Sequence, residues 1–502
     1  MLAFLSVSDL RHGTKPGIFS IFLLIIAFIG QTSAPQASDI TLSMLASFSG
    51  TNGADPRAPL VQARDGNLYG TTYAGGPTTN LSDFGHPGFG TVFKVTPDGT
   101  LTSLAAFYGT NGSHPRAALV QASDGNFYAT TYSGGSATNA LSFGQIGYGT
   151  VFRMTPDGNL TTLISFNGTN GACPAAGLVE GPDGNLYGTA RFGGASFSDP
   201  RAANTGYGVP GDGTIFRIST NGIFTTLFSF TPDTQGGQPM APLTLGSDGS
   251  FYGIVSGGAY GWGEIFRVSL DGIFTPVVSL DSVNGPSQLS AVVESRDGGF
   301  YGVAQVSGAY RCGAVYKFSA NESVITVVSF TNSGAFSWGS LVEGTDGDLY
   351  GTTCNSSDYQ YGYVYQVMPQ GDYAVIGSFA GTNGAAPQCG MIQGRDGSLY
   401  GTTISGGAFA DGFGLGYGTI FRLSVPSAAA PKLRMPAKDG AGVVLSWNAL
   451  PTRSYQVQYR NVDDAGWSNL GSGTILATNS LAFSSDLAPS SARFYRVLLL
   501  AE

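Results

Sequence analysis

Hydrophobic and polar residues alternate along most of the chain, in short stretches separated by glycine-rich turns. Such alternation is typical of β-strands that have one face buried and one face in solvent. The first group of stretches predicts four consecutive strands, Leu60–Ala63, Leu68–Thr72, Gly90–Val95 and Leu101–Phe107. Asp65-Gly66 predicts a tight turn after the first strand, because glycine accepts the positive φ that hairpin turns need. The group therefore predicts one antiparallel four-stranded sheet.

One phrase, Asp-Gly-x-(Leu/Phe)-Tyr, marks the first turn and the second strand of every group. It occurs seven times, with its tyrosine at Tyr69, Tyr128, Tyr187, Tyr252, Tyr301, Tyr350 and Tyr400. The spacing between successive tyrosines of the phrase, together with the glycine-rich turns, indicates a propeller or a related array. The seven aspartates fit turn formation. A catalytic carboxylate cluster is the alternative, but equivalent positions around a ring lie too far apart for the roughly 5–9 Å spacing of paired catalytic acids.

The two ends of the array predict how it closes. Leu42–Phe48 has the pattern of a fourth strand, yet it precedes the first repeat, and the seventh repeat ends after its third strand at Gly418–Leu423. Pairing of these two segments would complete the last blade and leave no open edge. The prediction is an all-β, seven-bladed β-propeller closed by an N-terminal strand. An open solenoid of β-hairpins is the alternative, but it does not explain the displaced strand.

The repeats resemble a known family. The phrases DGNLYGTT, GTVFKVTPDG and FxGTNGxxP look like the GloVer tandem repeats of exported bacterial "choice-of-anchor" proteins, and the first is also similar to the propeller repeats of two-component sensor ectodomains. The resemblance covers roughly residues 40–425. It implies an exported protein with a variable C-terminal attachment, and it carries no assigned activity. Because no LPxTG-type sorting signal or basic tail is visible, covalent anchoring is not expected.

The N-terminal segment has the layout of a secretory signal peptide. A basic head holding Arg11 precedes the apolar run Gly17–Gly30, which is shorter than the about 20 residues of a membrane span. Residues 1–37 are therefore expected to be removed near Ala34 or Ala37, with an uncleaved anchor as the alternative. The mature chain is expected to be secreted, on the cell surface or periplasmic, without a membrane span.

Residues 39–425 form the predicted propeller and residues 426–502 a separate unit. After a linker at Ser427–Pro431 the glycine phrases stop, and alternation continues at Val443–Trp447, Tyr455–Tyr459 and Phe494–Leu498. The order of a tryptophan strand, a tyrosine strand and a late Tyr-Arg-Val strand resembles a fibronectin type III-like β-sandwich. Modules of this kind space, dock or adhere.

Charge and motif content exclude several function classes. The formal net charge is -9, and charged residues are 11% of the chain, which disfavours nucleic-acid binding. The chain holds 3 histidines, too few for multi-histidine metal chemistry. It contains no G-x-S-x-G, H-E-x-x-H, C-x-x-C or EF-hand motif, so no catalytic residue, metal ligand or cofactor is assigned. Ca²⁺ held by backbone carbonyls would leave no motif.

Two features single out one side of the ring. Long connections between the second and third strands occur in repeats 1, 2, 3 and 7, at Tyr73–Phe89, Tyr132–Tyr148, Arg191–Asp212 and Ile404–Tyr417. The phrase Gly-Thr-Asn-Gly precedes the same four repeats, at Gly50–Gly53, Gly109–Gly112, Gly168–Gly171 and Gly381–Gly384. In a closed ring, blades 7, 1, 2 and 3 are contiguous and both features lie on one face. Long loops on a rigid scaffold commonly carry function.

The loops of this arc hold aromatic rings and neutral hydrogen-bonding groups. The candidate binding residues are Phe84, Phe89, Phe143, Tyr148, Phe192, Tyr207, Phe413, Tyr417, Asn52, Asn111, Asn170 and Asn383. Such groups suit carbohydrate or peptide better than phosphate. The alternative interpretations are that the aromatic rings pack the loops against each other, and that repeats 1–3 are alike through recent duplication.

The remaining reactive side chains give weak signals. His86 and His114 could act as a base by residue type, but the interpretation of each as a surface residue in a variable loop is favoured. Of the cysteines, Cys173, Cys312, Cys354 and Cys389, a disulfide of Cys354 with either Cys312 or Cys389 is open in an exported protein.

The sequence favours an exported, non-catalytic binding or scaffold protein. Its contact surface would be the long-loop face of blades 7-1-2-3, and its partner a carbohydrate or a surface protein. A secreted polysaccharide-cleaving hydrolase or lyase is the alternative, by analogy with other propellers alone. A purely structural role at the cell surface is a third interpretation.

Overall fold

The computed structural model describes residues 40–424 and the strands between 437 and 499. Within these limits it leaves out the following segments: 79–86, 138–145, 198–208, 232–235, 258–262, 281–289, 305–312, 319–323, 331–336, 338, 355–359, 369–370, 410–415, 440–441, 449–453, 462–467, 471–474, 477–480 and 487–492. The chain divides into two compact units, one spanning Pro35–Ala428 and the other containing Ala429–Glu502. The predicted signal peptide and linker lie outside the described residues.

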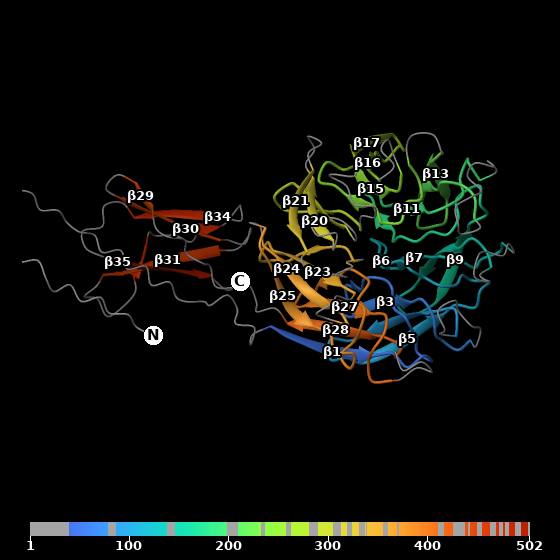
Figure 1. Ribbon diagram of the computed structural model, residues 1–502, viewed down its shortest axis with the longest axis horizontal. Coiled ribbons are helices and arrows are strands. Elements are labelled where there is room, and N and C mark those ends of the chain that lie inside the picture. The colour runs from blue at the N-terminus through green and yellow to red at the C-terminus, as the bar shows by residue number, and fades with distance from the viewer. Residues whose placement is uncertain are drawn as a thin grey trace, which may run out of the picture. The chain divides into compact units, whose positions relative to one another are not determined.

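The larger unit is a ring of four-stranded antiparallel sheets, one for each sequence repeat (Figure 1). Blade 1 consists of β2 (Val61–Gln62), β3 (Leu68–Thr72), β4 (Thr91–Val95) and β5 (Leu101–Ala106). Blade 2 consists of β6 (Val120–Gln121), β7 (Phe127–Thr131), β8 (Thr150–Met154) and β9 (Leu160–Ser165). Blade 3 consists of β10 (Val179–Glu180), β11 (Leu186–Ala190), β12 (Thr214–Ile218) and β13 (Phe224–Ser229). The short first strand of each blade lies nearest the ring axis and the fourth at the rim, as β6 and β9 show in Figure 1.

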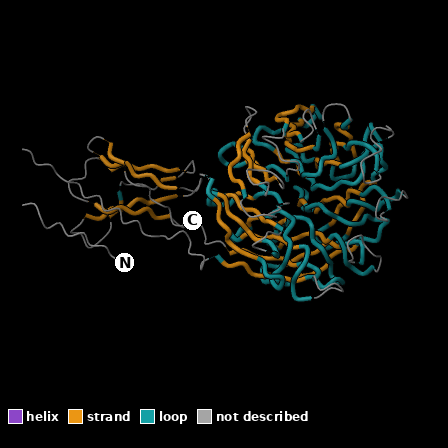
Figure 2. The backbone as a smooth tube through the Cα atoms, in the orientation of Figure 1, coloured by secondary structure: helices purple, strands orange, loops and turns teal. Residues whose placement is uncertain are grey.

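Blades 4 to 6 repeat this order. Blade 4 is β14 (Thr244–Leu245), β15 (Phe251–Val255), β16 (Glu264–Val268) and β17 (Phe274–Ser279). Blade 5 is β18 (Val293–Glu294), β19 (Phe300–Ala304), β20 (Ala314–Phe318) and β21 (Val324–Ser329). Blade 6 is β22 (Val342–Glu343), β23 (Leu349–Thr353), β24 (Tyr363–Val367) and β25 (Tyr373–Ser378). Figure 2 shows strands and loops but no helix in the described parts of the chain, and accordingly no described helix is long and apolar enough to cross a membrane.

Blade 7 confirms the predicted closure. It consists of β26 (Ile392–Gln393), β27 (Leu399–Thr403) and β28 (Thr419–Ser424), completed by β1 (Thr41–Ser47) from the other end of the propeller sequence. β1 pairs antiparallel with β28, from Thr41 opposite Ser424 to Ser47 opposite Thr419. The protein is therefore a seven-bladed β-propeller, and the open solenoid is excluded.

The Asp-Gly-x-(Leu/Phe)-Tyr phrase is a structural unit. In all seven blades the tyrosine hydroxyl donates a hydrogen bond to the aspartate four residues earlier, over 2.5 to 3.2 Å between oxygens. In blade 1 the other carboxylate oxygen of Asp65 accepts from the backbone N–H of Asn67 at 3.0 Å, and Gly66 has a φ of 85°. The aspartates thus fix the turn and orient the tyrosine, as the turn interpretation predicts.

The hydrophobic core lies between adjacent blades. Where the next blade begins its second strand with phenylalanine, the tyrosine packs on that ring, with centroids 4.4 Å apart for Tyr69 and Phe127 and 4.3 Å for Tyr187 and Phe251. Phe93 and Phe152 of the third strands are fully buried in the same layers. Burial of these rings removes apolar surface from water and stabilises the contact between neighbouring blades.

The C-terminal unit contains two small antiparallel sheets. One is formed by β29 (Ala437–Asp439), β30 (Gly442–Asn448) and β34 (Leu481–Asp486). The other is formed by β31 (Ser454–Asn461), β32 (Ser468–Asn469), β33 (Ile475–Leu476) and β35 (Arg493–Leu499). The three predicted strands appear in β30, β31 and β35. The relation to fibronectin type III stays a prediction.

Candidate functional site

The Gly-Thr-Asn-Gly phrases form tight turns that their asparagines brace. In the first turn, Gly50 and Gly53 exchange two backbone hydrogen bonds of 3.1 and 3.2 Å, and the side-chain oxygen of Asn52 accepts from the backbone N–H of Ser49 at 2.9 Å. Asn111, Asn170 and Asn383 accept the equivalent bond at 2.8, 2.9 and 2.8 Å. The oxygens of these four candidate binding residues are thus engaged within their own turns.

These turns are hydrogen-bonded to the long loops of the same blades. The carbonyl of Gly50 accepts from the N–H of Gly76 at 2.9 Å, at the start of the long loop of blade 1. The equivalent bonds measure 2.8 Å in blades 2 and 3 and 2.9 Å in blade 7, from Gly135, Gly194 and Gly407. The two sequence features that single out this arc are therefore parts of one structural unit.

The described aromatic candidates pack into this unit. Tyr148 is 6% exposed and Phe192 fully buried, and both belong to the core between blades 2 and 3. Phe89 and Tyr417 are half-buried, and Phe89 contacts the ring of His114 edge-on at 5.9 Å. This placement fits the packing interpretation for these four rings. Phe84, Phe143, Tyr207 and Phe413 lie outside the described residues, as does His86.

The second residue after each of these four turns, and the equivalent residue of blade 4, adopt a left-handed backbone conformation. Five equivalent non-glycine residues have φ between 51° and 57°: Asp55, His114, Cys173, Gln238 and Ala386. The backbone N–H of each donates a hydrogen bond to a carbonyl of the preceding blade, as that of His114 does to the carbonyl of Phe89 at 2.9 Å. A proline follows each of them, and the chain then enters the first strand near the ring axis. This geometry carries the next residues toward the centre of the ring.

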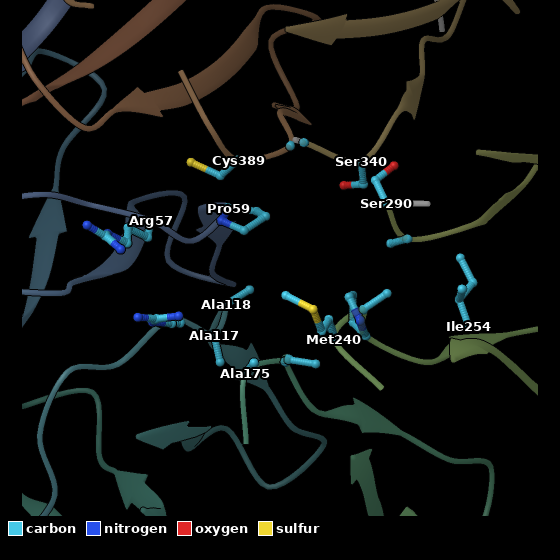
Figure 3. Close-up of a pocket in the computed structure, with 18 of the residues that line it drawn as sticks. Arg57, Pro59, Ala117, Ala118, Ala175, Met240, Ile254, Ser290, Ser340 and Cys389 are labelled. Carbon is cyan, nitrogen blue, oxygen red and sulfur yellow. The ribbon is translucent and has the colours of Figure 1, made fainter. Parts of the chain in front are cut away.

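The side chains that converge there line an axial cavity of about 290 Å³. All seven blades contribute to it, chiefly where their first strands begin, so the cavity lies toward the long-loop face. Arg57 and Arg116 supply one wall, from blades 1 and 2, whereas Met240, Ile254 and other apolar residues of blade 4 supply another. Figure 3 shows Arg57 and Ile254 on opposite sides, with hydroxyl groups of Ser290 and Ser340 between them.

Two tyrosines hold the arginines at the cationic wall. Arg57 forms a buried ion pair with Asp55, with 2.6 Å between nitrogen and oxygen, and lies over the ring of Tyr73 at 4.2 Å. Arg116 lies over the rings of Tyr132 and Tyr73, at 4.2 and 5.0 Å, and donates a long hydrogen bond of 3.4 Å to the Tyr73 hydroxyl. Cation–π contacts of this kind hold a guanidinium without neutralising its charge.

His114 is buried, so the surface interpretation is wrong. It is 4% exposed, and its Nδ1 lies 3.0 Å from the hydroxyl of Ser133. Burial, together with the charges of Arg116 and Arg57, lowers its pKa to about 4, so the imidazole is neutral at pH 7. The cause of the burial is the left-handed turn, which directs the side chain inward between Tyr73 and Phe89.

The predicted pairing of Cys354 with Cys389 is not formed, because Cys389 carries a free, buried thiol. That thiol lies 2.7 Å from the hydroxyl of Thr402, and burial raises its pKa to about 11. Burial likewise raises the pKa of the free Cys173 thiol to about 12. Cys312 lies outside the described residues, so its pairing with Cys354 stays a prediction.

Sequence analysis that looks for aromatic loop residues and known motifs does not find the side chains that line the cavity. Their signal in the sequence is the phrase x-Pro-Arg, which follows the turn only in repeats 1 and 2, at Arg57 and Arg116. Both arginines lie in the segment that leads into the innermost strand, which passes near the ring axis, and charged residues are scarce in this chain. Among the described residues, no three His, Cys, Asp or Glu side chains gather as metal ligands.

Comparison with solved structures finds other propellers. A virginiamycin B lyase from Staphylococcus aureus is 14% identical over 77% of this chain and 99% of its own, with a TM-score of 0.49. A putative 6-phosphogluconolactonase from Bacteroides uniformis is 14% identical over 81% of this chain and 97% of its own, with a TM-score of 0.43. A gluconolactonase from Xanthomonas campestris is 12% identical over 78% of this chain and 91% of its own, with a TM-score of 0.38. These likenesses concern the fold alone.

A search of the curated proteins finds no match. The model of the Gloeobacter/Verrucomicrobia repeat family matches three segments, residues 33–198, 202–342 and 288–444. Together these segments span the propeller and confirm the family resemblance of the repeat phrases. The chain belongs to the Gloeobacter/Verrucomicrobia repeat family.

Proposed function

We propose that this protein is an exported, non-catalytic binding propeller that receives a small ligand, or the end of a longer one, in its axial cavity. The observation that supports it is the cavity itself, a space of about 290 Å³ with a cationic wall opposite an apolar one. Ligand sites are typically concave and largely apolar, with a few polar groups that orient the ligand. All seven blades line the cavity, including blades 1, 2, 3 and 7, which carry the long loops.

The lining favours binding over catalysis. None of the described residues that line the cavity is an aspartate, a glutamate or a histidine. The nearest carboxylate, Asp55, is 3% exposed and paired with Arg57, and the neighbouring His114 is 4% exposed. The thiol of Cys389 in the lining is protonated at neutral pH, because burial raises its pKa. General acid–base or nucleophilic catalysis needs such groups within reach of the substrate.

Export is part of the proposal and rests on the sequence of residues 1–37 alone. We expect the full chain, expressed in a bacterium, to be recovered outside the cytoplasm with a new N-terminus near residue 35 or 38. Mass spectrometry of the purified protein reads that terminus directly. Recovery from the cytoplasm with Met1 retained would contradict this part only.

Thermal unfolding against a ligand panel tests the binding proposal. The panel holds neutral oligosaccharides, peptides, small organic acids, Ca²⁺ and EDTA. A ligand that binds only the native state stabilises it by about 2.7 kcal/mol at a hundred times its Kd. The expected stabilisation should be lost in Ala118→Trp and in Met240→Trp, which fill the cavity from two walls.

Ile273→Trp is the matched control, because Ile273 is 69% exposed and lies outside the cavity lining. A ligand that stabilises both filled variants as strongly as the wild type binds elsewhere and contradicts the proposal. Turnover of any panel member would instead support the hydrolase or lyase alternative.

A further inference from the structure

We propose that the axial cavity binds a small amphipathic monocarboxylate, with its carboxylate on Arg116 and its apolar part against Met240 and Ile254. This inference rests on the proposed binding function and names its ligand class. It is carried by the charge balance of one wall and the apolar character of the opposite one.

The cationic wall, formed by Arg57 and Arg116, carries one positive charge that no carboxylate neutralises. Asp55 neutralises Arg57 through hydrogen bonds of 2.9, 3.0 and 2.6 Å to both of its oxygens. Arg116 contacts the rings of Tyr73 and Tyr132, but none of the described residues forms an ion pair with it. A positive charge thus stands in the wall of a cavity within a chain of net charge -9.

The guanidinium of Arg116 also has unused hydrogen-bonding capacity. Its Nε is buried and has no hydrogen-bond partner. A buried donor without a partner costs about 1–3 kcal/mol, and more for a charged group, so the surrounding protein does not fully satisfy this guanidinium. The ring contacts of Arg116 engage the face of the guanidinium, whereas its hydrogen bonds lie in its plane. Arg116 as a whole is half-buried and lines the cavity, so the terminal nitrogens of its guanidinium, rather than the enclosed Nε, can meet a ligand, and they match the two oxygens of a carboxylate.

The opposite wall selects for an apolar body. Met240 is 41% exposed, although methionine is usually buried, and Ile254, Val255 and Leu280 stand beside it in the lining. Removing apolar surface from water contributes roughly 25 cal/mol per Å². A ligand that spans the cavity would gain this contribution while its charged end pairs with Arg116.

The volume and the charge of the cavity restrict the class of ligand further. A volume of about 290 Å³ is just below the range of about 300 to 1,000 Å³ that is usual for ligand sites, so the ligand must be small. A single uncompensated guanidinium balances one negative charge, which favours a carboxylate over a doubly charged phosphate. Because the described lining holds no acidic side chain, nothing there repels an anion.

The test compares acids with their neutral amides on the full chain. Isothermal titration would measure octanoate and 4-ethylbenzoate, each beside its primary amide, at low and at physiological salt. We expect each acid to bind at least tenfold more tightly than its amide. Arg116→Gln should weaken acid binding at least tenfold and leave amide binding within threefold, and Arg116→Lys should lie between.

Arg267→Gln is the matched control, since it removes an exposed arginine that pairs with Asp248 away from the cavity. It should leave all four affinities unchanged. Equal binding of acid and amide, or acid binding that survives Arg116→Gln, overturns the carboxylate assignment but leaves the cavity as a binding site. Absence of binding by both acids also overturns it, and the broader ligand panel then decides separately whether the binding function stands.

Discussion

The side-chain oxygen of Gln62 accepts a hydrogen bond of 2.8 Å from the backbone N–H of Arg395, 333 residues later in the chain. Gln62 lies in the innermost strand of blade 1 and Arg395 in the first turn of blade 7, so the bond crosses the closure of the ring. Its amide nitrogen also donates to the carbonyl of Gly66 at 3.0 Å. One side chain thus holds its own turn and the adjoining blade together.

The same bond recurs between five other pairs of neighbouring blades, for example from the N–H of Arg64 to Gln121 at 2.8 Å. The interface between blades 3 and 4 differs on both sides. The donor position is Pro182, which has no N–H, and the acceptor position is Leu245. Because this interface lacks both the donor and the acceptor of the bond, neither group is left there without its partner.

Gln62→Leu should lower the free energy of unfolding by about 2 kcal/mol, because it removes two hydrogen bonds, each with a usual net contribution of about 1 kcal/mol. Gln62→Glu is the matched control, because Glu180, Glu294 and Glu343 accept the equivalent bond in other blades. It keeps the acceptor for Arg395 but loses the donor to Gly66, so the loss of stability should be about half that of Gln62→Leu. Urea unfolding followed by tryptophan fluorescence measures both variants. Equal loss in the two would show that the acceptor oxygen is not what stabilises the closure.

Tyr128→Phe should lower the free energy of unfolding by about 1–2 kcal/mol. The Tyr128 hydroxyl donates to Asp124 at 2.7 Å, and its ring is fully buried, so removal of the oxygen leaves a small defect and one lost bond to a charged group. Asp124 keeps its bonds from the N–H and the side chain of Asn126, at 3.0 and 2.9 Å.

The pKa of Asp124 offers a second measurement of the same bond. Burial alone would raise that pKa, but hydrogen bonds from Asn126 and Tyr128 bring it below the ordinary value. Tyr128→Phe should therefore raise it, as read from the carboxyl carbon shift in NMR titration. An unchanged pKa together with unchanged stability would contradict a structural role for the repeated Asp–Tyr pair.

Gly53→Ala should destabilise the protein more than Gly66→Ala does. Both glycines have positive φ, at 129° and 85°, so each alanine introduces backbone strain of about 1–2 kcal/mol. At Gly53 the new methyl group would also lie 2.6 Å from the Thr72 side chain and 2.8 Å from that of Thr91, whereas at Gly66 nothing lies within 4 Å. Overpacking adds about 1–3 kcal/mol. Urea unfolding measures both variants. If the two lose comparable free energy of unfolding, the Thr72 and Thr91 side chains do not lie close to Gly53.

Much of the fold follows from local sequence, and the reason is its repetition. The second strand of blade 1 is predicted and observed at Leu68–Thr72, because a fixed turn phrase precedes it. The displaced strand at Leu42–Phe48 predicts the ring closure, and β1 forms it at Thr41–Ser47. Each repeat presents the same pattern, so an error in one would conflict with the other six.

The site is less accessible to such reasoning, because residue type does not reveal whether a loop side chain points inward. Asn52 and Tyr148 have the composition of a binding surface, yet the first braces a turn and the second is 6% exposed in the core. Arg116 belongs to no recognisable motif, but the left-handed residue before it turns the chain toward the axis. The decisive information is the backbone conformation at His114, which a variable loop residue does not encode by itself.

That histidine should make the stability of the protein depend on pH in a predictable direction. The pKa of His114 is about 4 in the folded protein, lowered first by burial and then by Arg116 and Arg57, against 6.5 for an ordinary histidine. Below pH 6.5 the unfolded chain binds a proton that the folded protein does not. The free energy of unfolding should therefore fall as the pH drops from 6.5 to 4, by at most about 1.4 kcal/mol per pH unit from this group.

His114→Gln isolates this contribution, because Gln238 occupies the equivalent left-handed position in blade 4. The difference in unfolding free energy between wild type and variant should be constant above pH 7 and should shift in favour of the variant on acidification, by about 3 kcal/mol at pH 4. Urea unfolding at half-unit steps of pH measures it. Since the carboxylates titrate in both proteins, their contribution cancels in the difference. A difference that stays constant down to pH 4 would mean that His114 is accessible to protons in the folded state, which is incompatible with its position behind the cationic wall.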